Sequence, residues 1–109
     1  MLLWENQNPS TMFAAQTVNI GDVSGYSTLL IISDIASIEI PTDAVKQNYS
    51  LGAPFVNLSN AANIFSRRIS LIDNNVSFTD CLSLTLASNS HTYETTNSIN
   101  IPFRIYGIK

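Results

Sequence analysis

The chain has 109 residues, a formal net charge of −3 and 12% charged residues, about half the share of an ordinary soluble domain. Its five basic residues are too few for an electrostatic footprint on nucleic acid or on an anionic membrane. The single cysteine excludes an intrachain disulfide framework. The longest apolar run, Leu29–Ile32, is far shorter than the about 20 residues of a membrane-spanning helix, and we expect no signal peptide.

Neutral polar residues take the place of the missing charges. Serine, threonine and asparagine make up 35 of the 109 residues, while the hydrophobic share is an ordinary 45%. These three residue types are poor in helix interiors but suit turns and the solvent-exposed faces of strands. The composition therefore predicts a β domain with a real core and a neutral, hydrogen-bonding surface.

The first half of the chain shows strand signals separated by a glycine-containing loop. We expect a strand at Gln16–Ile20, a loop at Gly21–Gly25 and a central strand at Thr28–Ser33. Because Thr28–Ser33 does not alternate, both of its faces should be covered, one of them by the core, and a second subunit could cover the other. Ala36–Ile40 alternates as a half-buried strand, which Pro41 ends because proline cannot donate to the ladder.

The clearest periodic pattern is a hairpin in the second half. Ile64–Ile72 and Val76–Leu86 alternate with period 2 and are joined at Asn74-Asn75, which is typical of a tight turn. In the second strand of this hairpin, the apolar residues at alternate positions should all face the core, with a bulge or turn near 80–81. Arg67 falls among the apolar positions of the first strand, so we expect it at a sheet edge or with its head group reaching past the core.

The remaining segments are less regular. We expect loop with one short strand over 41–62, an exposed loop over 88–98, and a last strand at Ile99–Ile108 with Pro102 at an edge or a strand start. About seven or eight short strands without an amphipathic helix predict a single all-β domain over residues 1–109, an antiparallel β-sandwich that is possibly jelly-roll-like.

Catalytic and metal-binding patterns are weak, and we expect neither an enzyme nor a cofactor. A nucleophile–histidine–acid triad would have to use the only histidine, His91, with Asp80 or Glu94. The acids are scattered singly, without the clustering of a metal site. A glycosidase would need two facing carboxylates, and distant acids can meet in three dimensions. The acids that we consider for such a pair are Asp34, Glu39, Asp73 and Asp80.

The aromatic residues admit two interpretations. They could form a sugar-stacking platform beside asparagine and aspartate donors, or Trp4 and Tyr26 could be core or interface residues. Tyr93 is harder to place in a core because it lies in the polar segment with His91 and Glu94. The five aromatic residues in question are Trp4, Tyr26, Tyr49, Tyr93 and Tyr106.

Both ends of the chain resemble small virion structural proteins of tailed phages that infect Gram-positive bacteria. The N-terminal likeness covers residues 2–32, and the C-terminal one, Ile101–Lys109, resembles the closing strand of that group. The N-terminal motifs are Leu3-Trp4-Glu5-Asn6, Asn8-Pro9, Phe13-Ala14-Ala15-Gln16-Thr17-Val18 and Ser24-Gly25-Tyr26. These proteins are head-fibre, tail-fibre or baseplate-associated components. The resemblance implies a protein made in the bacterial cytoplasm and located in the virion, with a homotrimer and other virion proteins as partners.

The first functional hypothesis is therefore a fibre or receptor-binding domain that attaches non-covalently to a host cell-wall glycan. The binding segments would be Asn89–Asn97 and Asn48–Asn63. Two alternatives stay open, a capsid head-fibre or decoration protein without its own ligand and a glycan-cleaving depolymerase fragment. The candidate ligand-binding residues are His91, Tyr93, Glu94, Asn97, Tyr49 and Asn57.

Overall fold

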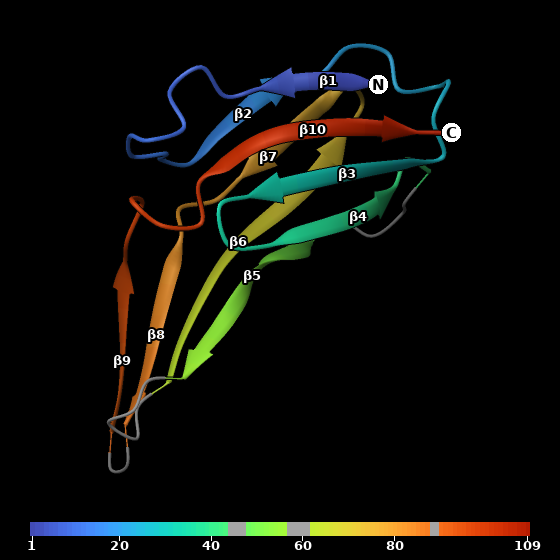
Figure 1. The fold of residues 1–109 in the computed structure, drawn as a ribbon. Coiled ribbons are helices and arrows are strands. Elements are labelled where there is room, and N and C mark those ends of the chain that lie inside the picture. The colour runs from blue at the N-terminus through green and yellow to red at the C-terminus, as the bar shows by residue number, and fades with distance from the viewer. Residues whose placement is uncertain (44–47, 57–61, 88–89) are drawn as a thin grey trace.

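The computed structural model describes residues 1–43, 48–56, 62–87 and 90–109, and in these residues the chain is all-β, without a helix. Two antiparallel sheets, one of four strands and one of six, confirm the expected β-sandwich class (Figure 1). The ten described strands are more than the seven or eight that we expected. The described strands are β1 (Leu2–Glu5), β2 (Gln16–Asn19), β3 (Thr28–Ser33), β4 (Ser37–Pro41), β5 (Tyr49–Val56), β6 (Ala62–Ile72), β7 (Asn75–Phe78), β8 (Leu82–Ala87), β9 (Ser90–Thr95) and β10 (Pro102–Ile108). A jelly-roll-like topology stays a prediction.

The four-stranded sheet has the order β1-β10-β3-β4 and joins the two ends of the chain. β10 starts at Pro102 and lies between β1 and β3, where Tyr106 pairs with Leu2 on one side and with Leu30 on the other. β3 is a central strand, as predicted. Its inward residues Leu29 and Ile31 are fully buried, while its outward residues Leu30 and Ile32 are half-buried. A second subunit over this outward face stays a prediction.

The six-stranded sheet is organised around β6, which has 11 residues. The order is β2-β7-β6-β8-β9, and β5 pairs with the other edge of β6. One end of β6 pairs with β7 and the other end with β8, so these two short strands follow one another along the same edge. The β6–β7 turn lies at residues 73–74, one residue earlier than expected, with Asp73 at a φ of 55°.

The hydrophobic core lies between the four-stranded sheet and the β2-β7-β6 end of the other sheet. Trp4 is half-buried and packs on Phe13 and Phe78, with both ring-centroid distances at 6.2 Å. Tyr26 lies over Gly107, where a Cβ atom would come within 2.7 Å of its ring, so only glycine fits there. These contacts favour a packing role for Tyr26, whereas Trp4 packs on the core and keeps part of its surface exposed. The buried core residues are Phe13, Ile20, Leu29, Ile31, Ile40, Leu51, Ile69, Leu71, Val76, Phe78, Ile101 and Ile105.

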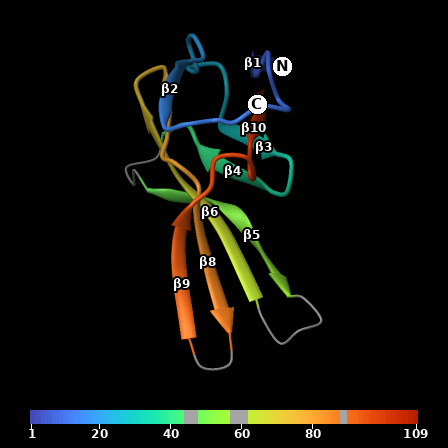
Figure 2. The same ribbon diagram turned by 90° about the vertical axis from the view of Figure 1, so that its left-hand side faces the viewer.

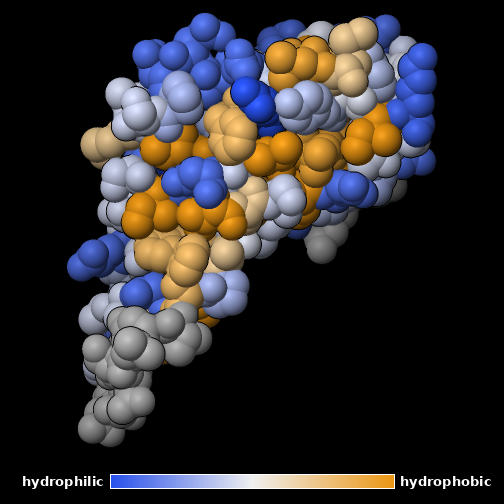
Figure 3. All heavy atoms as spheres, in the orientation of Figure 1, coloured by the Kyte–Doolittle hydropathy of each residue, from blue (hydrophilic) through white to orange (hydrophobic). Residues whose placement is uncertain are grey.

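Beyond the core, the six-stranded sheet projects as a single layer, which we call the arm. It consists of β8, β9 and the parts of β5 and β6 that run beside them, residues 52–56, 62–66, 82–87 and 90–95. Figures 1 and 2 show these four strands side by side, with no other described element over them. The molecule is therefore elongated, 49 × 29 × 20 Å. The space-filling view shows the arm projecting from the broader body of the molecule (Figure 3). Its radius of gyration is 14.9 Å, against about 13 Å for a compact chain of this length.

A one-residue bulge separates the core from the arm. Ile69 pairs with Phe78, and Ser66 pairs with Leu82. Between these two pairs, β6 advances by three residues, whereas the opposite β7–β8 edge advances by four. The bulge near residues 80–81 confirms the prediction, but the predicted facing of β8 is wrong. The extra residue reverses the side-chain parity. Val76 and Phe78 therefore face the core, whereas Leu82 is 45% exposed.

The segment 88–98, which we expected to be a loop, contains a strand, and the one short strand expected within 41–62 is longer than predicted. Within 88–98, β9 pairs with β8 through six residues although every one of its side chains is exposed. Within 41–62, β5 is an eight-residue strand along β6. A strand that relies on backbone pairing has no need of an apolar face, so hydrophobic periodicity does not reveal it. Pro54 is tolerated in β5 because this strand pairs on one side, with β6.

Arg67 corrects another expectation. It lies neither at an edge nor with its head group in solvent, but is completely buried in the middle of β6. Its Nε donates to the Asn100 carbonyl (2.6 Å), Nη1 to that of Thr79 (3.1 Å) and Nη2 to that of Ile99 (3.3 Å). Its guanidinium carbon also lies 5.3 Å from the centroid of the Phe13 ring. Arg67 thus ties the bulge and the segment before β10 to the core.

Candidate functional site

A depression of about 300 Å³ opens between β1, the segment that follows it, and β2. Aromatic and aliphatic side chains form part of its lining, and neutral amide side chains form most of the polar remainder. The lining residues are Trp4, Glu5, Asn6, Gln7, Asn8, Thr11, Met12, Phe13, Gln16 and Val18. We refer to this depression as the β1–β2 pocket. Its volume is at the lower end of the range for small-molecule sites.

Hydrogen bonds fix the loop that builds the pocket. The backbone N–H of Asn6 donates to the Phe103 carbonyl (2.9 Å), and its side-chain Nδ2 donates to that of Pro102 (2.9 Å). Its Oδ1 accepts a hydrogen bond from the backbone N–H of Asn8 (2.9 Å), an Asx turn that sets the direction of the loop. At the other end, the backbone N–H of Phe13 donates to the Asn97 carbonyl (2.9 Å). The pocket is thus held at both ends by the body of the sandwich.

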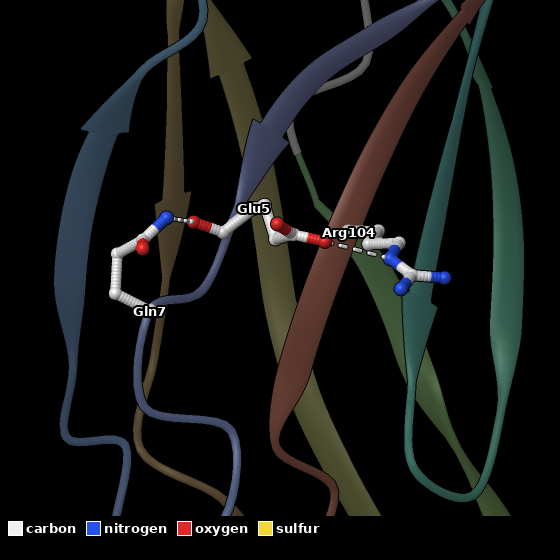
Figure 4. A network of polar contacts seen from close by, with 3 residues as sticks. All are labelled: Glu5, Gln7 and Arg104. Carbon is white, nitrogen blue, oxygen red and sulfur yellow. Dashed lines mark hydrogen bonds and ion pairs between the residues drawn. The ribbon is translucent and has the colours of Figure 1, made fainter.

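Figure 4 shows the polar rim beside β1 and β10. Arg104 Nε donates to Glu5 Oε2 at 3.0 Å, across the register pair of these two strands. This hydrogen bond to the Glu5 carboxylate raises the pKa of the Arg104 guanidinium above its ordinary value. Both side chains are nearly half exposed, so the ion pair orients them more than it stabilises the fold.

Two amides on the rim remain available to a ligand. Gln7 Nε2 donates a long hydrogen bond to the Glu5 carbonyl (3.3 Å), and Gln16 Nε2 donates to that of Ala14 (3.1 Å). Both glutamines are exposed, and their Oε1 atoms accept no hydrogen bond from the described residues. Amide oxygens and an aromatic ring suit a neutral, hydroxyl-rich ligand, which needs hydrogen-bond partners and an apolar surface rather than charge.

Among the six expected ligand-binding residues, the structure brings only His91 and Tyr93 together. Their rings make an edge-to-face contact with centroids 5.7 Å apart on β9. Glu94 follows Tyr93 and therefore points to the opposite face of the arm. Tyr49 pairs with Ile69 and packs against the core, and Asn57 lies outside the described residues.

Asn97 has a structural position rather than an open one. Its Oδ1 accepts a hydrogen bond from the backbone N–H of Cys81 (2.9 Å), and its Nδ2 donates to Asp80 Oδ1 (3.0 Å). The same Asp80 oxygen accepts a hydrogen bond from the backbone N–H of Ala15 (2.8 Å). The backbone bond from Ala15, followed by the Asn97 amide, holds the pKa of Asp80 below its ordinary value. Asn97 and Asp80 therefore connect the base of the arm to the segment before β2.

The buried polar groups next to this connection form hydrogen bonds with one another and with the backbone. Asn100 has a φ of 56° and is fully buried. Its Nδ2 donates to the Leu51 carbonyl and its Oδ1 accepts from the Ser33 hydroxyl, both at 2.6 Å. Burial lowers the pKa of Arg67 and raises that of the Cys81 thiol. With its hydrogen-bond partners in the protein backbone, Arg67 is a structural cation, and nothing in this cluster is presented to a substrate.

The acids considered for a glycosidase pair have structural or separate positions. Asp34 Oδ1 accepts from the backbone N–H of Ile101 at 2.7 Å, Glu39 faces outward on β4, and Asp73 lies in the β6–β7 turn. Across the described ranges, no three histidine, cysteine or acidic residues cluster as metal ligands would. The same ranges contain no helix long and apolar enough to cross a membrane.

The sequence pointed to one part of the β1–β2 pocket, because Trp4 was among the aromatic residues considered for a sugar platform. It did not point to Gln7 and Gln16, which stand nine residues apart in the sequence and line the same pocket. The amide-rich run from Asn6 to Asn8 beside a tryptophan was the available signal.

Comparisons with known proteins add no relative. No protein-family model, curated protein or solved structure matches this chain. The function proposed below therefore rests on the geometry of the described residues, together with the resemblance that the sequence suggested at the two ends.

Proposed function

We propose that this chain is a virion structural protein of a tailed phage, of the fibre or receptor-binding type, that attaches non-covalently to a glycan on the host surface. It acts as a homotrimer among other virion proteins and carries out no catalysis. The observation that carries the attachment is the β1–β2 pocket, where amide side chains surround an aromatic wall.

The two ends that resemble phage virion proteins also lie together in space. Residues 2–32 contain β1 and β3, and Pro102–Ile108 is β10, which pairs with both of them. The β1–β2 pocket is built largely from the N-terminal part, residues 4–18. The resemblance and the proposed ligand site therefore fall on the same body of the sandwich, whereas the arm comes from the middle of the chain.

A glycan ligand agrees with the chemistry of the pocket. Glu5 is the one ionisable side chain among its described lining residues, and Arg104 occupies one of its carboxylate oxygens. A neutral sugar can stack its C–H face on an aromatic ring and exchange hydrogen bonds with amides. Catalysis would need a nucleophile or acid–base pair in position, and Glu5 has no second carboxylate among the described lining residues.

The test is binding of the purified full chain to isolated cell walls from a panel of Gram-positive bacteria. The double variant Gln7→Ala/Gln16→Ala should weaken binding at least about tenfold, because a site built for hydrogen bonds loses affinity when they go. Asn19→Ala, an exposed amide on β2 outside the pocket, is the matched control and should bind normally.

Three other results would each contradict this assignment. Cell-wall binding that is lost in Tyr93→Ala but kept in the double glutamine variant would move the site to the arm. Failure to bind any wall, with the protein present on capsids, would favour a decoration protein. Release of reducing sugar from wall polysaccharide would favour a depolymerase.

A further inference from the structure

The carboxylate of Asp80 contacts the segment that leads into β2, behind the wall of the β1–β2 pocket. Its Oδ1 accepts a hydrogen bond from the backbone N–H of Ala15 (2.8 Å), which lies 65 residues away in the sequence. Ala15 stands between Phe13 and Gln16, which both line the pocket, whereas Asp80 is not among the described lining residues. Asp80 therefore supports the wall without reaching the space that a ligand would occupy.

One peptide unit connects Asp80 with the side chain of Gln16. The N–H of Ala15 and the carbonyl of Ala14 belong to the same planar peptide, so a bond that fixes one of them also fixes the direction of the other. The Ala14 carbonyl accepts a hydrogen bond from Gln16 Nε2 (3.1 Å). With Nε2 bound to this carbonyl, Gln16 Oε1 is the acceptor that the side-chain amide presents to a ligand.

The bulge between β7 and β8 keeps Asp80 in place. On one side of it, the carbonyl of Thr79 accepts a hydrogen bond from Arg67 Nη1 (3.1 Å). On the other side, the backbone N–H of Cys81 donates to Asn97 Oδ1 (2.9 Å). Asn97 Nδ2 donates to the same Asp80 oxygen that Ala15 uses (3.0 Å). A bulge re-aims a side chain out of the regular alternation, and here the carboxylate is held from both neighbours and at its end.

We infer that Asp80 is a positioning residue of the β1–β2 pocket, which touches no ligand but orients the side-chain amide of Gln16 for one. The inference deepens the proposed function and rests on it for the effect on binding. The orientation of Gln16 can be measured without any ligand.

The exposure of Gln16 makes such support useful. A free glutamine side chain samples many rotamers, and a ligand that binds it must order it, which weakens binding. Gln16 is exposed, so the bond to the Ala14 carbonyl is what holds its amide. The negative charge of Asp80 strengthens the bond from Ala15, because charge-assisted hydrogen bonds are stronger than neutral ones. Gln7, on the opposite side of the pocket, donates to another carbonyl and does not depend on this peptide unit.

Asp34 provides a matched control. Its Oδ1 accepts a hydrogen bond from the backbone N–H of Ile101 (2.7 Å), a contact of the same kind over a similar separation, 67 residues against 65. Neither Asp34 nor Ile101 is among the described residues that line the pocket. Alanine at either aspartate removes one carboxylate and leaves one backbone N–H without its acceptor. Both variants should therefore lose a comparable amount of stability, but only Asp80→Ala should affect Gln16.

The first measurement follows the side-chain amide of Gln16 in the full chain by nitrogen–proton correlation NMR, assigned from the signal that disappears in Gln16→Ala. In Asp80→Ala the signal should move to the position of a freely rotating glutamine. In Asp80→Asn, whose amide oxygen can still accept from Ala15, it should stay near the wild-type position, as it should in Asp34→Ala. An unmoved Gln16 signal in folded Asp80→Ala would overturn the inference.

Circular dichroism checks that each variant is folded. Asp80→Ser, whose oxygen lies one bond closer to the backbone, replaces Asp80→Ala if that variant unfolds, and the same shift of the Gln16 signal is expected.

The second measurement is binding of the full chain to isolated cell walls, arranged as a double-mutant cycle. Asp80→Ala should weaken binding about three- to tenfold in the wild type and in Gln7→Ala, which corresponds to the net contribution of one hydrogen bond. In Gln16→Ala it should weaken binding less than about twofold, because no amide is left to orient. Equal losses in the Gln7→Ala and Gln16→Ala backgrounds would show that Asp80 acts on the fold as a whole.

Failure of the proposed function gives a different result. If the wild type binds no wall, or if Gln7→Ala/Gln16→Ala binds as well as the wild type, the attachment through this pocket is wrong. The NMR signal of Gln16 then still decides whether Asp80 orients this side chain.

Discussion

Replacing Arg67 by methionine should destabilise the protein much more than replacing its exposed neighbour Arg68. The guanidinium donates to three backbone carbonyls and lies 5.3 Å from the centroid of the Phe13 ring, in a position with no exposure to solvent. Methionine fills a similar volume but donates nothing. The carbonyls of Thr79, Ile99 and Asn100 would then lose their donor.

The magnitude follows from these contacts. Three unpaired carbonyls at about 1 kcal/mol each, the low end of the range, give about 3 kcal/mol. Loss of the cation–π contact adds about 0.5–1 kcal/mol. Removing the buried charge offsets part of this loss of stability, because the guanidinium no longer has to be taken out of water on folding. We expect a net loss of about 2–3 kcal/mol, and a melting temperature lower by about 10 °C.

Urea unfolding followed by Trp4 fluorescence measures this loss. Trp4 is the only tryptophan and packs on Phe13, so its emission reports on the same region. The protein concentration must be held constant, because dissociation of the proposed trimer would contribute to the apparent stability. Arg68→Met, at an exposed neighbour, is the control and should change stability by less than about 0.5 kcal/mol. If Arg67→Met changed it no more than that control, the guanidinium would not be holding the three carbonyls.

Three further predictions concern single sites. Gly52→Ala should lower the free energy of unfolding by more than about 3 kcal/mol, because the added Cβ would collide with the backbone carbonyl of Phe65. Gly25→Ala is the control, since a Cβ there meets open space, and equal melting temperatures of the two variants would contradict the prediction. Because the pKa of Asp80 is lowered on folding, its contribution is complete above its ordinary 3.8 and is lost as the pH falls through the lower folded value. Asp80→Asn should therefore flatten acid unfolding below about pH 4, and an unchanged pH profile would refute the assigned hydrogen bonds. Cys81 is buried with a raised thiol pKa, so a thiol reagent such as DTNB should label it only after unfolding, and fast labelling of the native protein would disprove its burial.

The candidate site was predictable only in part. A tryptophan beside several amides is visible in the sequence around Trp4. That Gln7 and Gln16 line one pocket depends instead on hydrogen bonds that Asn6 and Phe13 make to distant segments. The expected binding residues were chosen because they lie in polar stretches. Polarity shows that a segment is solvated, but not that its side chains converge, and only His91 and Tyr93 do so here.

Local patterns in the sequence were enough to predict the all-β class, the central strand Thr28–Ser33 and, to within one residue, the turn at 73–74, because period-2 alternation and turn residues act between near neighbours. Tertiary structure decided the direction of the side chains after the bulge. One residue inserted against β6 turns Leu82, Leu84 and Leu86 away from the core, although their spacing from Val76 and Phe78 predicted the opposite. The reason is that alternation fixes which residues share a face, whereas strand pairing fixes which face is covered.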